Sequence, residues 1–197
     1  MNKLKIYTIK EDYIHYLRKV DDNVLINKKE RRPYVGIVYQ INNYSYYIPL
    51  TSPKPKHAAM SNCEDFHKLN GGRYGAINFN KMIPVPDNVL IETDIHNTES
   101  QSYKGLLGRQ YISIKSIQNT IFRKSEELYT IFFTDDSKLT PHSLKVKNRC
   151  CRFDLLEIAC LTYLNEFSGF NNDESNLGNI TRNIAVTINE ESNIDST

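Results

Sequence analysis

The chain has 197 residues, 40% of them hydrophobic and 24% charged, with a formal net charge of +2 at pH 7. This composition is typical of one globular domain and excludes a largely disordered protein. No apolar run approaches the roughly 20 residues that a membrane span needs, and the N-terminus lacks an apolar signal-peptide core, so we expect a cytoplasmic protein without membrane association.

The first 86 residues predict a compact, mostly antiparallel sheet with one helix. Residues 5–9 form a short strand, and residues 11–20 carry apolar side chains at helical spacing. After a polar basic loop at 27–32, the β-rich runs 33–41 and 44–50 flank Asn42-Asn43. We expect a hairpin there, because asparagine tolerates the positive φ angles of a tight turn.

Three shorter β-rich segments follow the hairpin. Residues 66–69 and 74–77 lie on either side of "NGGR", which predicts a second turn, with the two glycines in the turn rather than in a phosphate-binding nest. Residues 82–86, "MIPVP", indicate a short strand of the kind found at sheet edges, because proline cannot donate a ladder hydrogen bond.

The pattern becomes helical after Pro86. Apolar stripes predict a helix over residues 102–121, a second over 121–133 and a third over 151–167. We therefore predict an α+β fold in a single domain, residues 1–170. Residues 171–197 are rich in Asn and Ser, carry five acidic side chains and one basic, and indicate a flexible acidic tail.

Charge is unevenly distributed along the chain. Residues 1–86 have a net charge of +7 and contain nine of the thirteen tyrosines, whereas residues 87–197 have a net charge of −5. Basic side chains mixed with aromatic ones suit a nucleic acid, although a basic face can also be only a solvated surface.

The common catalytic and metal-binding motifs are missing from the sequence. It has no Gly-rich phosphate loop, no HExxH, no GxSxG and no paired CxxC motif. Its four cysteines are expected to be free thiols, and we expect no metal and no cofactor.

The stretch "IPLTSPKPKH", residues 48–57, is the strongest candidate site. Two hydroxyls, Thr51 and Ser52, stand where a strand ends, and prolines on either side of Lys54 bias it toward an extended conformation. Such a loop can be a rigid solvated surface. It also has the donors and the cation of a phosphate clamp, with His57 able to titrate near neutral pH.

Several motifs occur together in the order found in a known family. They are "KIYTIKEDYIHYLRKVD", "RPYVGIV", "IPLTSPKPKH", "GAINFNKMIPVP", "YKGLLGRQYISI" and "CRFDLLE". Through them, residues 3–167 resemble the ToxN/AbiQ family, the endoribonuclease toxins of type III toxin–antitoxin and abortive-infection phage-defence systems.

The resemblance implies a barrel-like antiparallel core similar to the Kid and MazF toxins, with added helices. It implies metal-independent cleavage of adenine-rich single-stranded RNA to a 2′,3′-cyclic phosphate, with cellular and phage RNAs as substrates. It also implies inhibition by a repeated RNA pseudoknot that forms a closed assembly with the toxin.

The family's catalytic positions fall on Thr51, Ser52 and Lys54. Its further positions fall on Tyr13, Arg32 and His57, which with Lys56 are expected to bind RNA. The three positions carried over from the family each have a simpler interpretation: Tyr13 as a core tyrosine, Arg32 as a solvated loop charge, and His57 as a mere neighbour of Lys54. The tyrosines at 44, 46 and 47 are expected to pack in the hairpin. The alternative function is a non-catalytic module that sequesters RNA, and a DNA-directed nuclease is a third.

Overall fold

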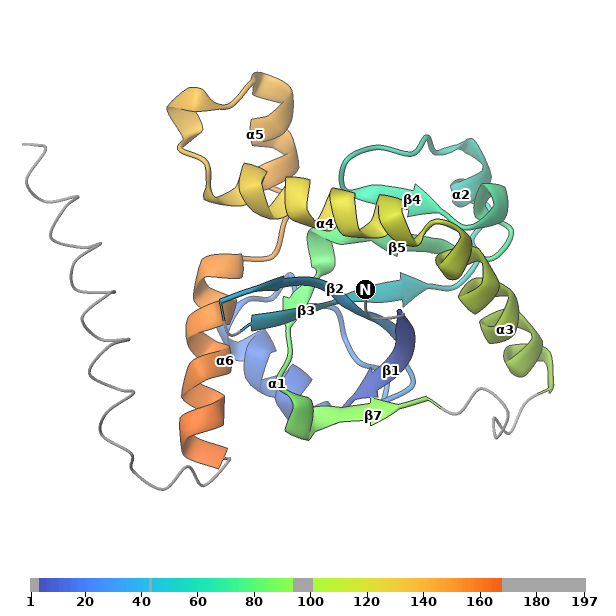
Figure 1. The fold of residues 1–197 in the computed structure, drawn as a ribbon, viewed down its shortest axis with the longest axis horizontal. Helices are drawn as coiled ribbons and strands as arrows, with labels where there is room; N and C mark the ends of the chain where they lie inside the picture. Colours follow the sequence, from blue (N-terminus) through green and yellow to red (C-terminus); the bar gives the residue numbers. More distant parts are fainter. Residues whose placement is uncertain (1–3, 43, 94–100, 168–197) are drawn as a thin grey trace, which may run out of the picture. The chain divides into compact units, whose positions relative to one another are not determined.

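The computed structural model describes residues 4–42, 44–93 and 101–167 of the chain (Figure 1). By their contacts, residues Met1–Thr162 form one compact unit, and a second begins at Tyr163. The tail predicted for residues 171–197 lies outside the described residues, so the expected boundary at residue 170 stays a prediction.

An antiparallel sheet forms the centre of the first unit. Its strand order is β4-β5-β3-β2-β1-β7, and β6 pairs with β3. The strands are β1 (Lys5–Ile9), β2 (Tyr34–Ile41), β3 (Tyr44–Thr51), β4 (Phe66–Lys68), β5 (Ala76–Asn78), β6 (Ile83–Pro84) and β7 (Leu90–Glu92). The α+β prediction is therefore confirmed. Within the described residues the strand order ends at β4 and β7, so the sheet is open rather than closed, and the likeness to Kid and MazF stays a prediction.

The predicted hairpin is formed by β2 and β3, with Ile41 opposite Tyr44 across the turn. Tyr46 and Tyr47 are buried, as expected for tyrosines that pack in the hairpin. The Tyr46 hydroxyl donates to Glu157, and so does the hydroxyl of Tyr129, at 2.8 and 2.9 Å. This shared carboxylate joins the hairpin to two helices.

The part of the chain that the structure describes also contains six α-helices. They are α1 (Glu11–Val20), α2 (Lys56–Ala59), α3 (Gln101–Ser116), α4 (Gln118–Phe133), α5 (Pro141–Lys147) and α6 (Phe153–Phe167). In Figure 1, α4 lies above the β2–β3 hairpin and α1 below it.

Two helical predictions need correction. The helix expected over residues 102–121 breaks at Ile117, whose φ of −114° and ψ of 19° are not helical, so α3 and α4 are separate. Helix α5 was not predicted, although Thr140 caps its N-terminus by accepting the Ser143 N–H and Pro141 occupies its first turn. A Thr-Pro pair is a recognised start signal, but seven residues are too few to show a helical period.

The apolar faces of the helices form the core with the sheet. In α1, Ile14 and Leu17 are buried together with Tyr13, while Val20 is 40% exposed at the helix end. In α3, Leu107 and Ile114 are buried, and a polar residue, Gln110, is buried with them at 2% exposure.

All four cysteines are free thiols, as predicted. Among the described residues, no helix is both long enough and apolar enough to cross a membrane.

Candidate functional site

The predicted hydroxyl pair lies at the end of β3, where the central strand meets β5. Thr51 is the last residue of β3 and pairs with Ala76. Its Oγ1 donates a hydrogen bond to the Ala76 carbonyl at 3.1 Å. Because that bond uses the hydroxyl proton, the lone pairs of Oγ1 remain to accept a hydrogen bond from a ligand.

Ser52 and Lys54 follow in an exposed, non-helical stretch. Within the residues that the structure describes, neither the Ser52 hydroxyl nor the Lys54 ammonium forms a hydrogen bond or an ion pair. Both groups are therefore available to an anion, and their role in a phosphate clamp stays a prediction.

The chain turns into α2 sooner than expected. Pro55 has helical angles, φ −51° and ψ −40°, and the His57 N–H donates to the Lys54 carbonyl at 2.9 Å. The extended conformation predicted for this loop thus ends at Lys54, because a proline also fits the first turn of a helix. Lys56 is exposed on this turn and remains close in sequence to Lys54.

His57 faces the interior and not a ligand. It is 3% exposed, and its ring meets the Phe66 ring edge-on at 5.7 Å. Burial, with a smaller effect from the charges of Lys54 and Lys56, lowers the pKa of His57. A buried, neutral imidazole supports the loop from below, which corrects the expectation that His57 touches RNA.

Tyr13 also lies in the core. Its side chain is 0% exposed, and its hydroxyl donates to the Pro84 carbonyl at 2.8 Å. In this conformation neither the ring nor the hydroxyl of Tyr13 can contact RNA. Tyr13 is a core tyrosine, which was the alternative to the expected RNA contact.

Arg32, in the loop just before β2, lines the same cavity as the hydroxyl pair. Its Nε donates to the Ile26 carbonyl at 2.7 Å, which fixes the start of the guanidinium, and burial lowers its pKa. Three residues of the preceding loop, Lys28, Lys29 and Glu30, have φ between 56° and 59°. Non-glycine residues rarely adopt this left-handed conformation, and here the Glu30 and Glu11 carboxylates each accept the other residue's backbone N–H.

Two hollows border the Thr51–Lys54 segment. A small cavity of about 40 Å³ is lined by Lys28, Arg31, Arg32, Pro33, Leu50, Thr51, Ser52, Tyr103, Leu106 and Gln110. A wider one of about 370 Å³ is lined by Pro53, Lys54, Pro55, Ala58, Gly71, Gly72 and Arg73. No acidic residue lines either hollow, so both favour an anion.

Sequence reasoning missed several of these lining residues. Arg73 follows the predicted glycine turn, and Lys28 and Arg31 belong to the basic loop, so their charge was visible but not their location. Gln110 lies within the apolar stripe predicted for residues 102–121, and the only sequence feature that could have indicated its role is that it is polar.

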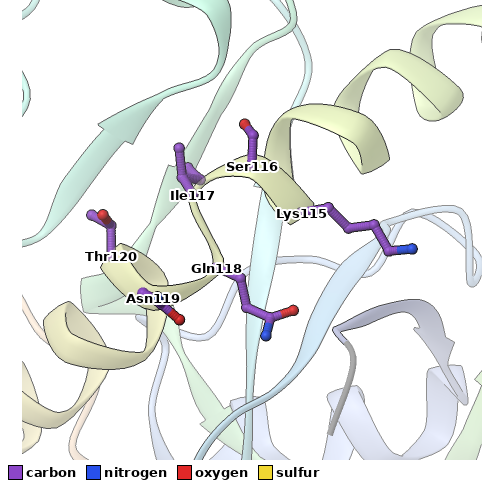
Figure 2. A pocket seen from close by; sticks show the side chains of 6 residues that line it. All are labelled: Lys115, Ser116, Ile117, Gln118, Asn119 and Thr120. Atoms are coloured by element: carbon purple, nitrogen blue, oxygen red, sulfur yellow. The ribbon is translucent and has the colours of Figure 1, made fainter. Parts of the chain in front are cut away.

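A third hollow, of about 390 Å³, lies at the bend between α3 and α4 and is lined by residues 115–120. Figure 2 shows Ser116 and Ile117 pointing to one side of the bend and Gln118 to the other. Although this hollow is slightly larger, it contains none of the predicted site residues and one charged side chain, Lys115. The end of β3 is therefore the stronger candidate.

The acidic residues nearest in sequence to the site have partners elsewhere. Asp65 forms an ion pair with Arg149 at 2.9 Å, and Glu64 lies 3.1 Å from His142. In residues 4–42, 44–93 and 101–167, no three His, Cys, Asp or Glu side chains come together as ligands for a metal ion.

Comparisons with known proteins agree on one family. Residues 5–160 match the family model described as toxin ToxN of type III toxin–antitoxin systems. The chain is 34% identical to endoribonuclease ToxN of Bacillus thuringiensis subsp. kurstaki, covering 81% of this chain and 84% of that protein. It is 32% identical to endoribonuclease AbiQ of Lactococcus lactis subsp. lactis, covering 64% of this chain and 74% of that one.

Solved structures give the same result. One, reported with selective toxin inhibition by a non-coding RNA pseudoknot, has a TM-score of 0.74 at 34% identity and covers 82% of this chain and 98% of that chain. The structure of AbiQ, described as a lactococcal anti-phage endoribonuclease, has a TM-score of 0.69 at 30% identity, covering 84% and 100%.

Proposed function

Since this chain belongs to the ToxN family and is an endoribonuclease toxin of a type III toxin–antitoxin system, we propose that it cuts adenine-rich single-stranded RNA without a metal ion. The products would be a 2′,3′-cyclic phosphate and a 5′-hydroxyl. The observation that carries this proposal is the grouping of a half-buried Thr51 with exposed Ser52 and Lys54 at the end of β3, between two hollows without acidic lining. The preference for adenine rests on the family resemblance.

The reaction needs an oriented 2′-hydroxyl, stabilisation of the charge on the phosphate and a proton for the leaving oxygen, and these groups supply them. The ribose 2′-hydroxyl loses its proton to solvent as its oxygen attacks the neighbouring phosphorus, the bond to the 5′-oxygen breaks, and that oxygen takes up a proton from the Lys54 ammonium. Thr51 Oγ1, whose own proton is held by Ala76, accepts the hydrogen bond of the 2′-hydroxyl and orients it for attack. Ser52 donates to a non-bridging oxygen, where one well-placed donor contributes roughly 3–4 kcal/mol to transition-state stabilisation.

Lys54 supplies the positive charge. Its ammonium stabilises the phosphate in the transition state and donates toward the leaving 5′-oxygen, and such proton transfer contributes about 10²–10⁴-fold. Arg32, in the small cavity, and Lys56, on the exposed turn, would bind phosphates on either side of the cut. Tyr13 and His57 support this surface from the core.

The same basic surface would accept an RNA antitoxin. One structural relative is described with inhibition by a non-coding RNA pseudoknot, and another with a processed non-coding RNA that regulates an antiviral system. We therefore include in the proposal a repeated pseudoknot RNA that assembles with the toxin into a closed particle. Because phosphate contacts dominate such binding, its affinity should fall steeply with salt.

Product analysis tests the proposal. Purified protein is incubated with an adenine-rich RNA in EDTA, and fragments are examined for a cyclic phosphate end. Ser52→Ala and Lys54→Ala should lose cleavage, and growth arrest on induction of the toxin alone should disappear. Lys19→Ala removes an exposed lysine from the last turn of α1 and serves as the matched control.

Each remaining outcome has a clear reading. Intact RNA with a gel shift would support the RNA-sequestering alternative, and cleavage that EDTA abolishes would refute the metal-independent mechanism. Undiminished toxicity in folded Ser52→Ala and Lys54→Ala would remove the site assignment.

A further inference from the structure

Helix α3 contacts the backbone that holds the hydroxyl pair. The Gln110 side chain is 2% exposed, and its Nε2 donates to the Tyr74 carbonyl at 2.7 Å. The neighbouring Arg109 places its guanidinium over the Tyr74 ring, 5.5 Å from the ring centre. Two successive residues of one helix therefore hold Tyr74, just before β5.

The Tyr74–Ala76 segment in turn fixes Thr51. Gly75 has a φ of +90° and lies so close to β3 that a Cβ there would be 1.9 Å from the Thr51 carbonyl oxygen. The next residue, Ala76, accepts the Thr51 hydroxyl. The Tyr74 carbonyl held by Gln110 is thus two residues from the Ala76 carbonyl that accepts the Thr51 hydroxyl, with the close Gly75–Thr51 contact between them.

Gln110 also belongs to the site by location. It lines the small cavity together with Thr51, Ser52 and Arg32. Burying an amide among apolar side chains disfavours folding unless the amide forms a hydrogen bond, as Gln110 does with Tyr74. Packing alone would be served equally well by Leu or Met at this position.

We propose that Gln110 is a positioning residue for cleavage: through Tyr74, Gly75 and Ala76 it holds the Thr51 hydroxyl in the orientation that accepts the ribose 2′-hydroxyl. This proposal rests on the proposed function, because it assigns Gln110 a role only if Thr51 takes part in the reaction. Gln110 touches neither the scissile phosphate nor the attacking oxygen in this scheme.

A double-mutant cycle tests the proposal. Thr51→Val removes the hydroxyl at nearly constant shape, and Gln110→Met removes the amide donor at similar length. Single-turnover cleavage is measured over a range of enzyme concentrations, which separates the maximal rate from the concentration for half-maximal rate. Thermal melts establish that each variant is folded at the assay temperature, and Gln110→Leu repeats the test if methionine is not accommodated.

The expected result is specific to positioning. Gln110→Met should lower the maximal rate by about 10–100-fold and change the half-maximal concentration by less than about threefold, since a misplaced catalytic group costs rate more than binding. Gln110→His, whose ring N–H replaces the amide donor, should recover most of this loss. In the Thr51→Val background, Gln110→Met should lower the rate by less than about threefold, because the group it positions is gone.

A matched control and the contrary outcomes complete the experiment. Gln101→Met makes the same substitution at an exposed position of α3 and should leave the rate unchanged. Multiplying effects of Thr51→Val and Gln110→Met, or full activity of Gln110→Met, would overturn the positioning role while leaving the cleavage mechanism intact. Full activity of Thr51→Val would instead refute the role of Thr51, and this proposal with it.

Discussion

The contact between Gly75 and Thr51 allows a sharp test of how the site is built. Gly75→Ala adds one methyl group at a residue with φ +90°, where it would meet the Thr51 carbonyl oxygen at 1.9 Å. Real Cβ contacts are not shorter than 3.0 Å, so β5 or the end of β3 must retreat by more than about 1 Å in a close-packed interior. Gly71→Ala is the matched control, because Gly71 has φ +63° in the same turn but nothing within 4 Å of an added Cβ.

The expected magnitudes follow from this difference. A left-handed conformation costs a non-glycine residue about 1–2 kcal/mol, and both variants carry this penalty. Gly75→Ala also disrupts the end of the β3–β5 ladder, where Leu50 pairs with Ile77 and Thr51 with Ala76, at about 1 kcal/mol per hydrogen bond. We expect about 1–2 kcal/mol for Gly71→Ala and about 3–4 kcal/mol for Gly75→Ala.

Two assays separate the alternatives. For a domain of this size, 1 kcal/mol corresponds to a change in Tm of about 2–4 °C, so the two variants should differ by several degrees in a thermal melt. Gly75→Ala should also lose about 100-fold in cleavage at a temperature where it is folded, because the hydroxyl pair moves. Equal melting temperatures and normal cleavage by Gly75→Ala would show that the close approach does not exist in solution.

Three further predictions test other contacts. Glu30→Ala removes the carboxylate that accepts the first N–H of α1 and should lower the free energy of unfolding by about 1 kcal/mol, while Glu30→Gln, which keeps an acceptor, should lose less in a urea titration. Burial lowers the pKa of both His57 and His67, so the unfolded chain binds more protons below about pH 6.5. The contribution of these histidines to the free energy of unfolding should therefore be fully present above that pH and decline as the pH falls toward the folded-state pKa values. In thermal melts, a variant with both histidines replaced by Gln should show a flatter dependence of Tm on pH. An unchanged slope would contradict this reasoning. Tyr46→Phe removes one of two hydrogen-bond donors to the half-buried carboxylate of Glu157, and burial already raises the pKa of that carboxylate. The substitution should lower the free energy of unfolding, measured by denaturant titration, by about 1–3 kcal/mol. An unaltered midpoint would mean that this hydrogen bond does not stabilise the fold.

Local patterns in the sequence were sufficient for most of the sheet and for the outer features of the site. Residues 5–9, the hairpin around Asn42 and the segments flanking "NGGR" became strands where alternation and turn residues predicted them. The hydroxyls and the lysine of "TSPK" stand at a strand end, with Ser52 and Lys54 exposed, as a motif between a β-rich run and two prolines indicates. These features depend on interactions between residues only a few positions apart, which a linear pattern records.

Contacts between distant residues decided the rest. The helix pattern could not show that α3 ends at Ile117, because the apolar stripe continues across the break. Neither could it show that Tyr13 and His57 are buried, since both residue types are found at surfaces and in cores. The basic loop at 27–32 was visible as charge, but only folding places Arg32 beside Thr51.

The sequence by itself thus determined which chemical groups this toxin has and that they stand at the end of a strand. Only the tertiary structure decided how those groups are held. The Gln110 amide lies 36 positions from Tyr74, and Ala76 lies 25 positions from Thr51, so no local spacing couples them. A hydroxyl can be oriented for chemistry when a close-packed backbone fixes its partner, and that arrangement arises only when α3, β5 and β3 pack together.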